Sequence, residues 1–374
     1  MLYFFFNLSF SLDAKQKFIK GNIQDKISAI KECTESDKLW LSNKAIDFVL
    51  ENSKYLNEDR DLETLAVTAI LSLPNDYGNL KLDKEKSEIA DKFIFLYDSF
   101  SYSKTVQISI ISKYLSLSKY LPTEPLKQRL NTYLSSPGSI TADPSLLKTI
   151  IVALGDIGDN ESFKILYNLQ DSKYKQHIDE INNSLTNLIP VSMNEVFILI
   201  QSKDINHLSR ISLLIDKKTK IPQNFISEIA ENLLNESIVI VGNTTTTKEQ
   251  LIEIQMKALK ILYDNKCTRA SKTVISYFDV AKNEFEQNLL TEDQFIFVIK
   301  SLAIAPIDSV NTLINYLMYL NSKVGNLTNV QVNVVIAVIN TLGAIGDKTA
   351  IDSLLDVTYL TYPESVLSAA QNAL

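Results

Sequence analysis

The sequence predicts an all-α protein built from stacked helical hairpins. Glycine and proline are scarce, with nine of each in 374 residues, whereas a sheet-rich fold needs many tight turns. Apolar residues recur at helical spacing along most of the chain. One helix–turn–helix segment also occurs twice, and internal repetition of this kind is typical of arrays of helical pairs.

The repeated segment is clearest at residues 145–169 and 333–357. When the two copies are superposed, the apolar residues of their first helices coincide, and so do the motifs Leu-Gly-Asp-Ile-Gly-Asp and Leu-Gly-Ala-Ile-Gly-Asp. Apolar positions at i, i+1, i+4, i+5 and i+8 give each first helix a wide apolar face. A single pair of helices cannot bury all of its apolar surface, so the pairs are expected to stack on one another.

Two glycines and an aspartate form the predicted turn of each copy: Gly155, Gly158 and Asp159 in the first, and Gly343, Gly346 and Asp347 in the second. The first glycine directly follows the apolar helix. Because glycine adopts the left-handed conformation of a C-cap without steric cost, we expect that helix to end at the Leu-Gly step. The aspartate follows the second glycine and is expected to cap the next helix.

Weaker copies of the unit fill the rest of the chain at a spacing of about forty residues, which predicts about seven to nine hairpins over residues 15–374. Residues 295–302 and 254–262 repeat the first-helix pattern most clearly among them. One irregular insertion is expected at residues 237–249, where β-branched residues and Gly242-Asn243 interrupt the pattern. A flexible connection is preferred there over a binding loop.

The motifs ending at Asp159 and Asp347 resemble HEAT repeats, in particular the short bacterial PBS-lyase-like type with its Ala-Leu-Gly-x-Ile-Gly-Asp signature. Two units match well, a third in part, and the remainder by period alone. The resemblance implies an α-solenoid, also called an α–α superhelix. HEAT units often pair the turn aspartate with a nearby cation, and Lys164 could serve Asp159, whereas Asp352 occupies the equivalent place after Asp347. The motif identifies a fold and says little about function.

Few residues are suited to a catalytic, cofactor or metal site. The two cysteines, Cys33 and Cys267, and the two histidines lack zinc-binding spacing. Gly155-x-x-Gly158 follows a helix, unlike a phosphate-binding loop. The single tryptophan, Trp40, is interpreted as a core residue. We therefore predict no catalytic residue, cofactor, metal or small-molecule substrate, and no disulfide between the cysteines. The net charge of −7 argues against a nucleic-acid partner.

Residues 1–12 are apolar and uncharged, and this run is too short to span a bilayer. It resembles the core and end of a secretory signal with a cleavage site at Ser9 or Ser11, although the basic n-region is missing. We interpret residues 1–14 as a signal or apolar N-terminal segment and expect export to the periplasm or cell envelope of a bacterium. The alternatives are a first helix buried against its neighbour and a cytoplasmic protein.

The expected function is a non-enzymatic scaffold or adaptor for protein partners, because arrays of helical pairs present extended surfaces. Tyr359 and Tyr362 follow the last predicted hairpin and are the candidate exposed anchors for a partner. Two alternatives stay open. The resemblance also covers enzymes that attach or detach bilins or excise damaged bases, although the acidic charge argues against base excision. An envelope protein could instead contact a membrane through residues 1–12.

Overall fold

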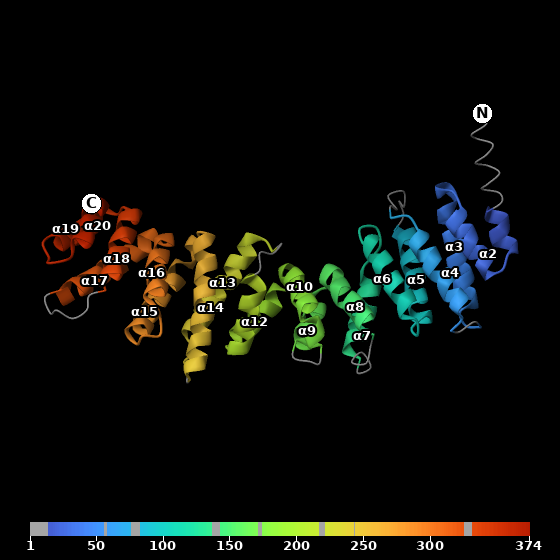
Figure 1. Ribbon diagram of the computed structural model, residues 1–374, viewed down its shortest axis with the longest axis horizontal. Helices are drawn as coiled ribbons and strands as arrows, with labels where there is room; N and C mark the ends of the chain where they lie inside the picture. The colour runs from blue at the N-terminus through green and yellow to red at the C-terminus, as the bar shows by residue number, and fades with distance from the viewer. Residues whose placement is uncertain are drawn as a thin grey trace, which may run out of the picture. The chain divides into compact units, whose positions relative to one another are not determined.

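The computed structural model describes residues 14–55, 58–75, 83–136, 143–170, 174–216, 221–242, 244–324 and 331–374. Within these ranges the ordered elements are helices, and no β-strand occurs, so the predicted all-α class is confirmed (Figure 1). The chain divides into two compact units, Met1–Val191 and Ser192–Leu374. Residues 1–13 of the predicted signal segment lie outside the described residues.

The first unit consists of two rows of helices. Its helices are α2 (Ile23–Glu32), α3 (Glu35–Asn52), α4 (Arg60–Ser72), α5 (Asp83–Ser99), α6 (Lys104–Ser116), α7 (Glu124–Ser135), α8 (Pro144–Ile157), α9 (Asn160–Leu169) and α10 (Ile178–Leu188), with 3₁₀ turns η2 (Lys175–His177) and η3 (Ile189–Val191). Helices α2, α4, α6, α8 and α10 pack in succession, each against the next. Helices α3, α5, α7 and α9 form the second row in the same way.

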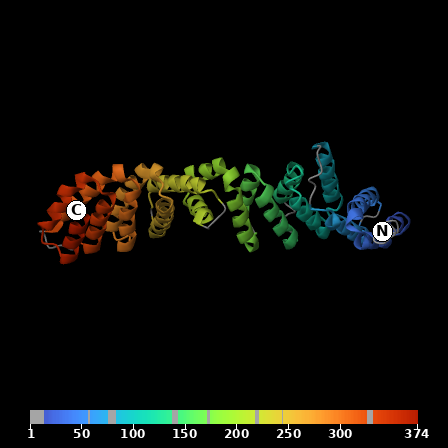
Figure 2. The same ribbon diagram turned by 90° about the horizontal axis from the view of Figure 1, so that it is seen from above.

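The second unit repeats this arrangement. Its helices are α11 (Met193–Gln201), α12 (Ile205–Asp216), α13 (Gln223–Ile238), α14 (Thr245–Asp264), α15 (Ser271–Glu286), α16 (Glu292–Ser301), α17 (Pro306–Lys323), α18 (Val332–Ile345), α19 (Ile351–Thr358) and α20 (Glu364–Ala373), with 3₁₀ turns η4 (Thr268–Ala270), η5 (Leu302–Ile304) and η7 (Lys348–Ala350). Helices α12, α14, α16, α18 and α20 form one row, and α11, α13, α15, α17 and α19 form the other. Figure 2 shows the orange and red helices of this unit standing side by side.

The apolar faces that define the sequence repeat are buried between these helices. The matching buried residues are Leu146, Leu147, Ile150, Ile151 and Leu154 of α8, and Val334, Val335, Val338, Ile339 and Leu342 of α18. None of them is more than 4% exposed. Burying a side chain of this size contributes about 1.5–3 kcal/mol, so this packing dominates the stability of each pair.

The first glycine of the motif does not end the helix, so that prediction is wrong. Gly155 lies inside α8, which continues to Ile157, and Gly343 lies inside α18, which continues to Ile345. Both glycines face the next helix of the row. A Cβ atom on Gly155 would lie 2.8 Å from the Cα atom of Ser184 in α10. The glycines therefore let neighbouring helices approach closely, which a side chain at these positions would prevent.

The ends of α8 and α18 are formed one turn later. Gly346 takes the left-handed conformation at the end of α18, with φ of +69°, whereas Gly158 ends α8 in an extended conformation. Asp159 accepts the backbone N–H groups of Glu161 and Ser162 at 3.0 and 3.1 Å and thereby caps α9. Asp347 accepts the N–H of Thr349 at 2.8 Å and caps η7.

Within each unit, polar contacts join successive helical pairs. The side chains that form them are 31 to 45 residues apart in the sequence. Ser103 donates to Glu63 at 2.8 Å in the first unit, and Arg269 donates to Glu231 at 2.9 Å in the second. Further contacts of this kind are Gln24–Asp61, Lys92–Asp47, Arg129–Asp98, Lys148–Glu180, Lys203–Glu236, Gln223–Asn265 and Tyr319–Glu286.

The turn aspartate Asp159 takes part in one of these contacts. Its carboxylate forms an ion pair with Lys127 at 2.6 Å. Lys127 belongs to α7, in the preceding pair, whereas the sequence had indicated Lys164 within the same unit. This ion pair holds the pKa of Asp159 below its ordinary value, against the opposing effect of burial, which is the largest single influence on it. The contact therefore links two pairs instead of bracing one.

The connection around residues 237–249 is shorter than the sequence indicated. Ser237 and Ile238 complete α13, and Thr245 to Glu249 form the first turn of α14. Thr244 caps α14 by accepting the N–H of Thr247 at 3.2 Å. The threonine run thus starts a helix, because its first hydroxyl satisfies a free N–H group there.

We predict that Gly343→Ala lowers the free energy of unfolding by about 1–2 kcal/mol. The new methyl group would lie 2.8 Å from the Cβ atom of Ala373 in α20, and such overpacking outweighs the gain of about 1 kcal/mol in helix propensity. Ala373→Gly in the same chain should restore much of the loss. Urea unfolding measures the free energy of unfolding of the single and double variants. The control is Asn340→Ala, because Asn340 is exposed on α18. Equal losses in the single and double variants would contradict close contact between α18 and α20.

Candidate functional site

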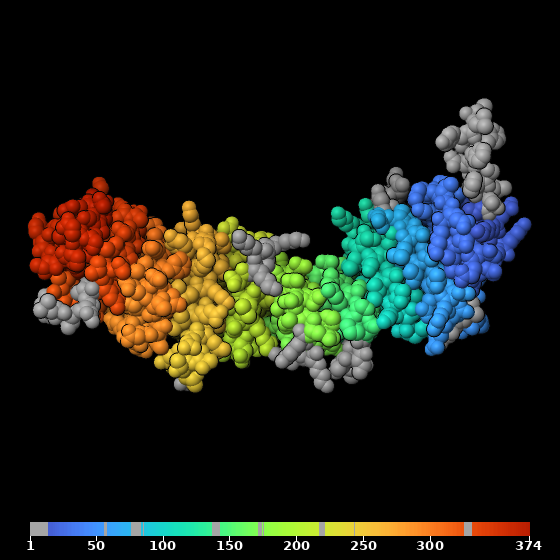
Figure 3. Space-filling view, in the orientation of Figure 1, coloured from blue at the N-terminus to red at the C-terminus, as the bar shows by residue number. Residues whose placement is uncertain are grey.

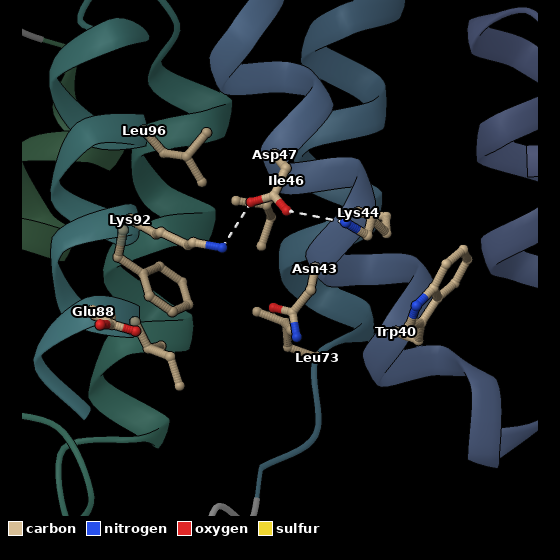
Figure 4. A pocket seen from close by; sticks show the side chains of 11 residues that line it. Trp40, Asn43, Lys44, Ile46, Asp47, Leu73, Glu88, Lys92 and Leu96 are labelled. Carbon is tan, nitrogen blue, oxygen red and sulfur yellow. Dashed lines mark hydrogen bonds and ion pairs between the residues drawn. The ribbon is translucent and has the colours of Figure 1, made fainter. Parts of the chain in front are cut away.

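A groove lies between α3 and α5 in the first unit, with a volume of about 370 Å³ (Figure 4). We call it the α3/α5 groove. Its lining residues are Trp40, Asn43, Lys44, Ile46, Asp47, Leu73, Glu88, Ile89, Lys92, Phe93 and Leu96. Leu73 directly follows α4, so the groove is lined by two helices, α3 and α5, and by the residue at the end of α4.

Helical spacing places these side chains on facing surfaces. Positions three and four apart lie above one another on a helix. One face of α3 therefore carries residues 40, 43, 44 and 47, and one face of α5 carries residues 88, 92 and 96. The deepest residues are apolar and at most 3% exposed: Ile46, Leu73, Phe93 and Leu96. The floor of the groove is therefore apolar, and its polar residues stand at the rim.

The rim is organised around Asp47. Its carboxylate lies 2.7 Å from the Lys92 ammonium and 4.0 Å from that of Lys44, as the dashed lines in Figure 4 show. All three side chains are at least 36% exposed, and exposed ion pairs of this kind contribute less than about 1 kcal/mol. The pairs therefore orient the charged groups across the groove and add little to stability.

Trp40 is 38% exposed, so the interpretation of this residue as core is wrong. Trp40 borders the groove, but Figure 4 shows its ring directed away from Asp47 and Lys92. The ring makes an edge contact with Phe18 at 6.5 Å between ring centroids. The Lys15 ammonium lies 5.7 Å from the centre of the Trp40 ring and 2.7 Å from the Asp37 carboxylate. The Trp40 ring therefore packs against the segment that precedes α2 and does not face the groove.

The two predicted anchors at the C-terminal end have different environments. Tyr359 is 82% exposed, between α19 and α20, as expected of a contact residue. Tyr362 is only 7% exposed, so its prediction as an exposed anchor is wrong. Its hydroxyl donates to Oδ1 of Asn321 at 3.1 Å, and burial raises its pKa to about 12. Tyr362 is a packing residue that joins the last pair to α17.

No three histidine, cysteine, aspartate or glutamate side chains of the described part of the chain come together in a way that could hold a metal ion. Among its helices, none is both long enough and apolar enough to cross a bilayer. Cys33 and Cys267 are free thiols that belong to different units.

Comparison with known proteins places the chain in no family. No protein-family model matches it, and no curated protein has significant sequence similarity to it.

A partly buried carboxyl group, that of Glu284, stands out in the second unit. It lies on α15, and its Oε2 atom has no hydrogen-bond partner among the described residues. Burial raises the pKa of Glu284 to about 7, and the Lys248 ammonium only partly offsets that effect. An ionised carboxylate without a partner is costly in such a place. The charge of this residue therefore opposes folding above neutral pH.

We predict opposite consequences for the two tyrosines. Tyr362→Ala should lower the free energy of unfolding by about 3 kcal/mol, because it opens a cavity and leaves Asn321 without its hydroxyl partner. Tyr359→Ala should change it by less than about 0.5 kcal/mol, because the side chain is exposed. Chemical denaturation followed by circular dichroism measures both. Similar losses in the two variants would contradict these placements.

We predict that Glu284→Gln stabilises the protein at pH 8 and has little effect at pH 5. The pKa is raised from 4.5 in the unfolded state to about 7 in the folded state. The folded protein is therefore stabilised by protonated Glu284 fully below pH 4.5, and this stabilisation is lost as the pH rises through 7. After allowance for partial exposure, the gain at pH 8 should be about 1–2 kcal/mol. Asp279→Asn, at an exposed position of α15, is the control. Thermal unfolding that shows the same effect of Glu284→Gln at both pH values would contradict the assignment.

Proposed function

We propose that the protein is a non-enzymatic scaffold of the HEAT-like α-solenoid type, and that it holds a protein partner in the α3/α5 groove. The solenoid part of the proposal is supported by the two rows of successive helices within each unit. It is further supported by polar contacts between residues 31 to 45 apart, which match the period of about forty residues expected for HEAT repeats. In the described part of the chain, helices α2–α20 make nine to ten stacked pairs, slightly more than the seven to nine hairpins expected from the sequence.

The observation that carries the functional proposal is the composition of the groove. Its floor is apolar, and its rim presents a carboxylate between two ammonium groups. An apolar side chain of a partner could enter the floor and exclude water, while polar groups of the same segment exchange ion pairs with Asp47 and Lys92. An amphipathic helix has the alternation of apolar and charged groups that this arrangement requires.

A site-specific photo-crosslinker tests this function. Glu88, at the exposed rim, is replaced by benzoylphenylalanine in the full chain, which is irradiated in its native cells and analysed by mass spectrometry. We expect an adduct with one discrete segment of a protein partner. The same adduct should weaken at least tenfold when Asn43→Trp fills the groove, because the partner's side chain then has no space.

The control places the crosslinker at Lys119, which is exposed and lies in the connection between α6 and α7. That position should not give the adduct. Equal adducts from both positions, or an adduct that Asn43→Trp leaves unchanged, would show that the groove does not hold the partner. Circular dichroism of each variant confirms that the helices are intact.

A further inference from the structure

The second unit contains a separate groove along α14, between this helix and α16. Its volume is about 500 Å³. The lining residues are Glu249, Ile252, Glu253, Met256, Lys257, Lys260, Leu289, Gln294 and Phe297. Six of these lie on one face of α14, at the i, i+3, i+4 spacing of a single helical stripe. Helix α14 has 20 residues, whereas α16 has 10. The yellow end of α14 projects beyond the neighbouring helices in Figure 3.

Charge is divided in two along this face. Glu249 and Glu253 lie in the first half of α14, and Lys257 and Lys260 lie in the second half. We call these four residues the α14 charge stripe. Within one chain, Lys257 pairs with Glu253 at 2.8 Å, and Lys260 pairs with Asp264 at 3.2 Å. The carboxylates of both pairs and the Lys260 side chain are more than half exposed, so they are accessible to an incoming partner.

A stripe that is acidic in one half and basic in the other is complementary to its own antiparallel copy. If two α14 helices, Thr245–Asp264, lie antiparallel with their ends aligned, Glu249 of each faces Lys260 of the other. Glu253 then lies beside Met256 and Lys257 of the other copy, near the two-fold axis. Asp264 comes to the N-terminus of the opposite α14, where the helix dipole favours negative charge. Every charge of the stripe gains an opposite partner in one register.

The groove also offers apolar surface at the centre of this contact. Ile252 forms its floor, and the half-buried residues Met256, Leu289 and Phe297 line its sides. Phe297 also forms an edge contact with Tyr263, at 5.4 Å between ring centroids, and Tyr263 is 37% exposed. Two copies related by a two-fold axis would pack these groups against one another, as in other isologous interfaces.

We propose that the protein forms a two-fold symmetric homodimer through the α14 charge stripe and the α14/α16 groove. The occupant of the groove is α14 of a second copy. This inference does not rest on the proposed scaffold function. The contact of four helices is modest, so a dissociation constant on the order of 1–100 μM is expected, and high salt should weaken it.

Charge exchange between two variants tests the proposal. The first carries Glu249→Lys and Glu253→Lys, and the second carries Lys257→Glu and Lys260→Glu. Each stripe then has a single sign, so each variant alone should be monomeric. Mixed in equal amounts, the two should form a heterodimer, because a basic stripe meets an acidic one. Sedimentation velocity of the full chain between about 1 and 100 μM, a range set by the expected affinity, measures all three states.

The control variant carries Lys272→Glu and Asp279→Lys, which reverse two exposed charges on α15 of the same unit. It should dimerise as the unmodified protein does. A wild-type protein that is monomeric over the whole range overturns the proposal and leaves the groove to a different partner. Dimerisation that persists in both single-sign variants, or a mixture that stays monomeric, also overturns it.

Discussion

The structure depends on the need of each helical pair to bury apolar surface on both of its sides. Helix α8, for example, packs against α6 on one side and α10 on the other, and the five apolar residues of its repeat pattern are at most 4% exposed. A side chain of that size contributes about 1.5–3 kcal/mol when buried, whereas an exposed ion pair contributes less than about 1 kcal/mol. The hydrophobic contacts therefore hold the pairs together, and the polar contacts fix how one pair sits on the next.

The same arrangement determines where ligands could bind. Helices of one row meet along ridges, and grooves form where side chains from successive pairs leave space, as between α3 and α5 or between α14 and α16. These grooves have apolar floors because the stacked faces continue beneath them. Their rims are charged because exposed helix positions carry lysine, aspartate and glutamate. Such surfaces are suited to helical segments of another chain, either a different protein or a second copy of this one.

Features that depend on local sequence could be predicted, and features that depend on the next pair could not. The buried faces of α8 and α18 follow from apolar spacing within one helix, and the cap by Asp159 follows from its position before α9. The role of Gly155 depends on Ser184, and the burial of Tyr362 depends on Asn321. Each of these partners lies some thirty to forty residues away, and only a register between repeats would have identified them. The α3/α5 groove has no sequence motif for the same reason.

Zero-length carbodiimide cross-linking tests most directly whether successive pairs stack in this register. The reagent joins an ammonium to a carboxylate in direct contact, and mass spectrometry then identifies the linked residues. The structure predicts bonds between Lys127 and Asp159, between Lys148 and Glu180, and between Lys203 and Glu236. If the folded protein instead links these lysines to carboxylates of pairs that are not neighbours, the stacking described here is incorrect.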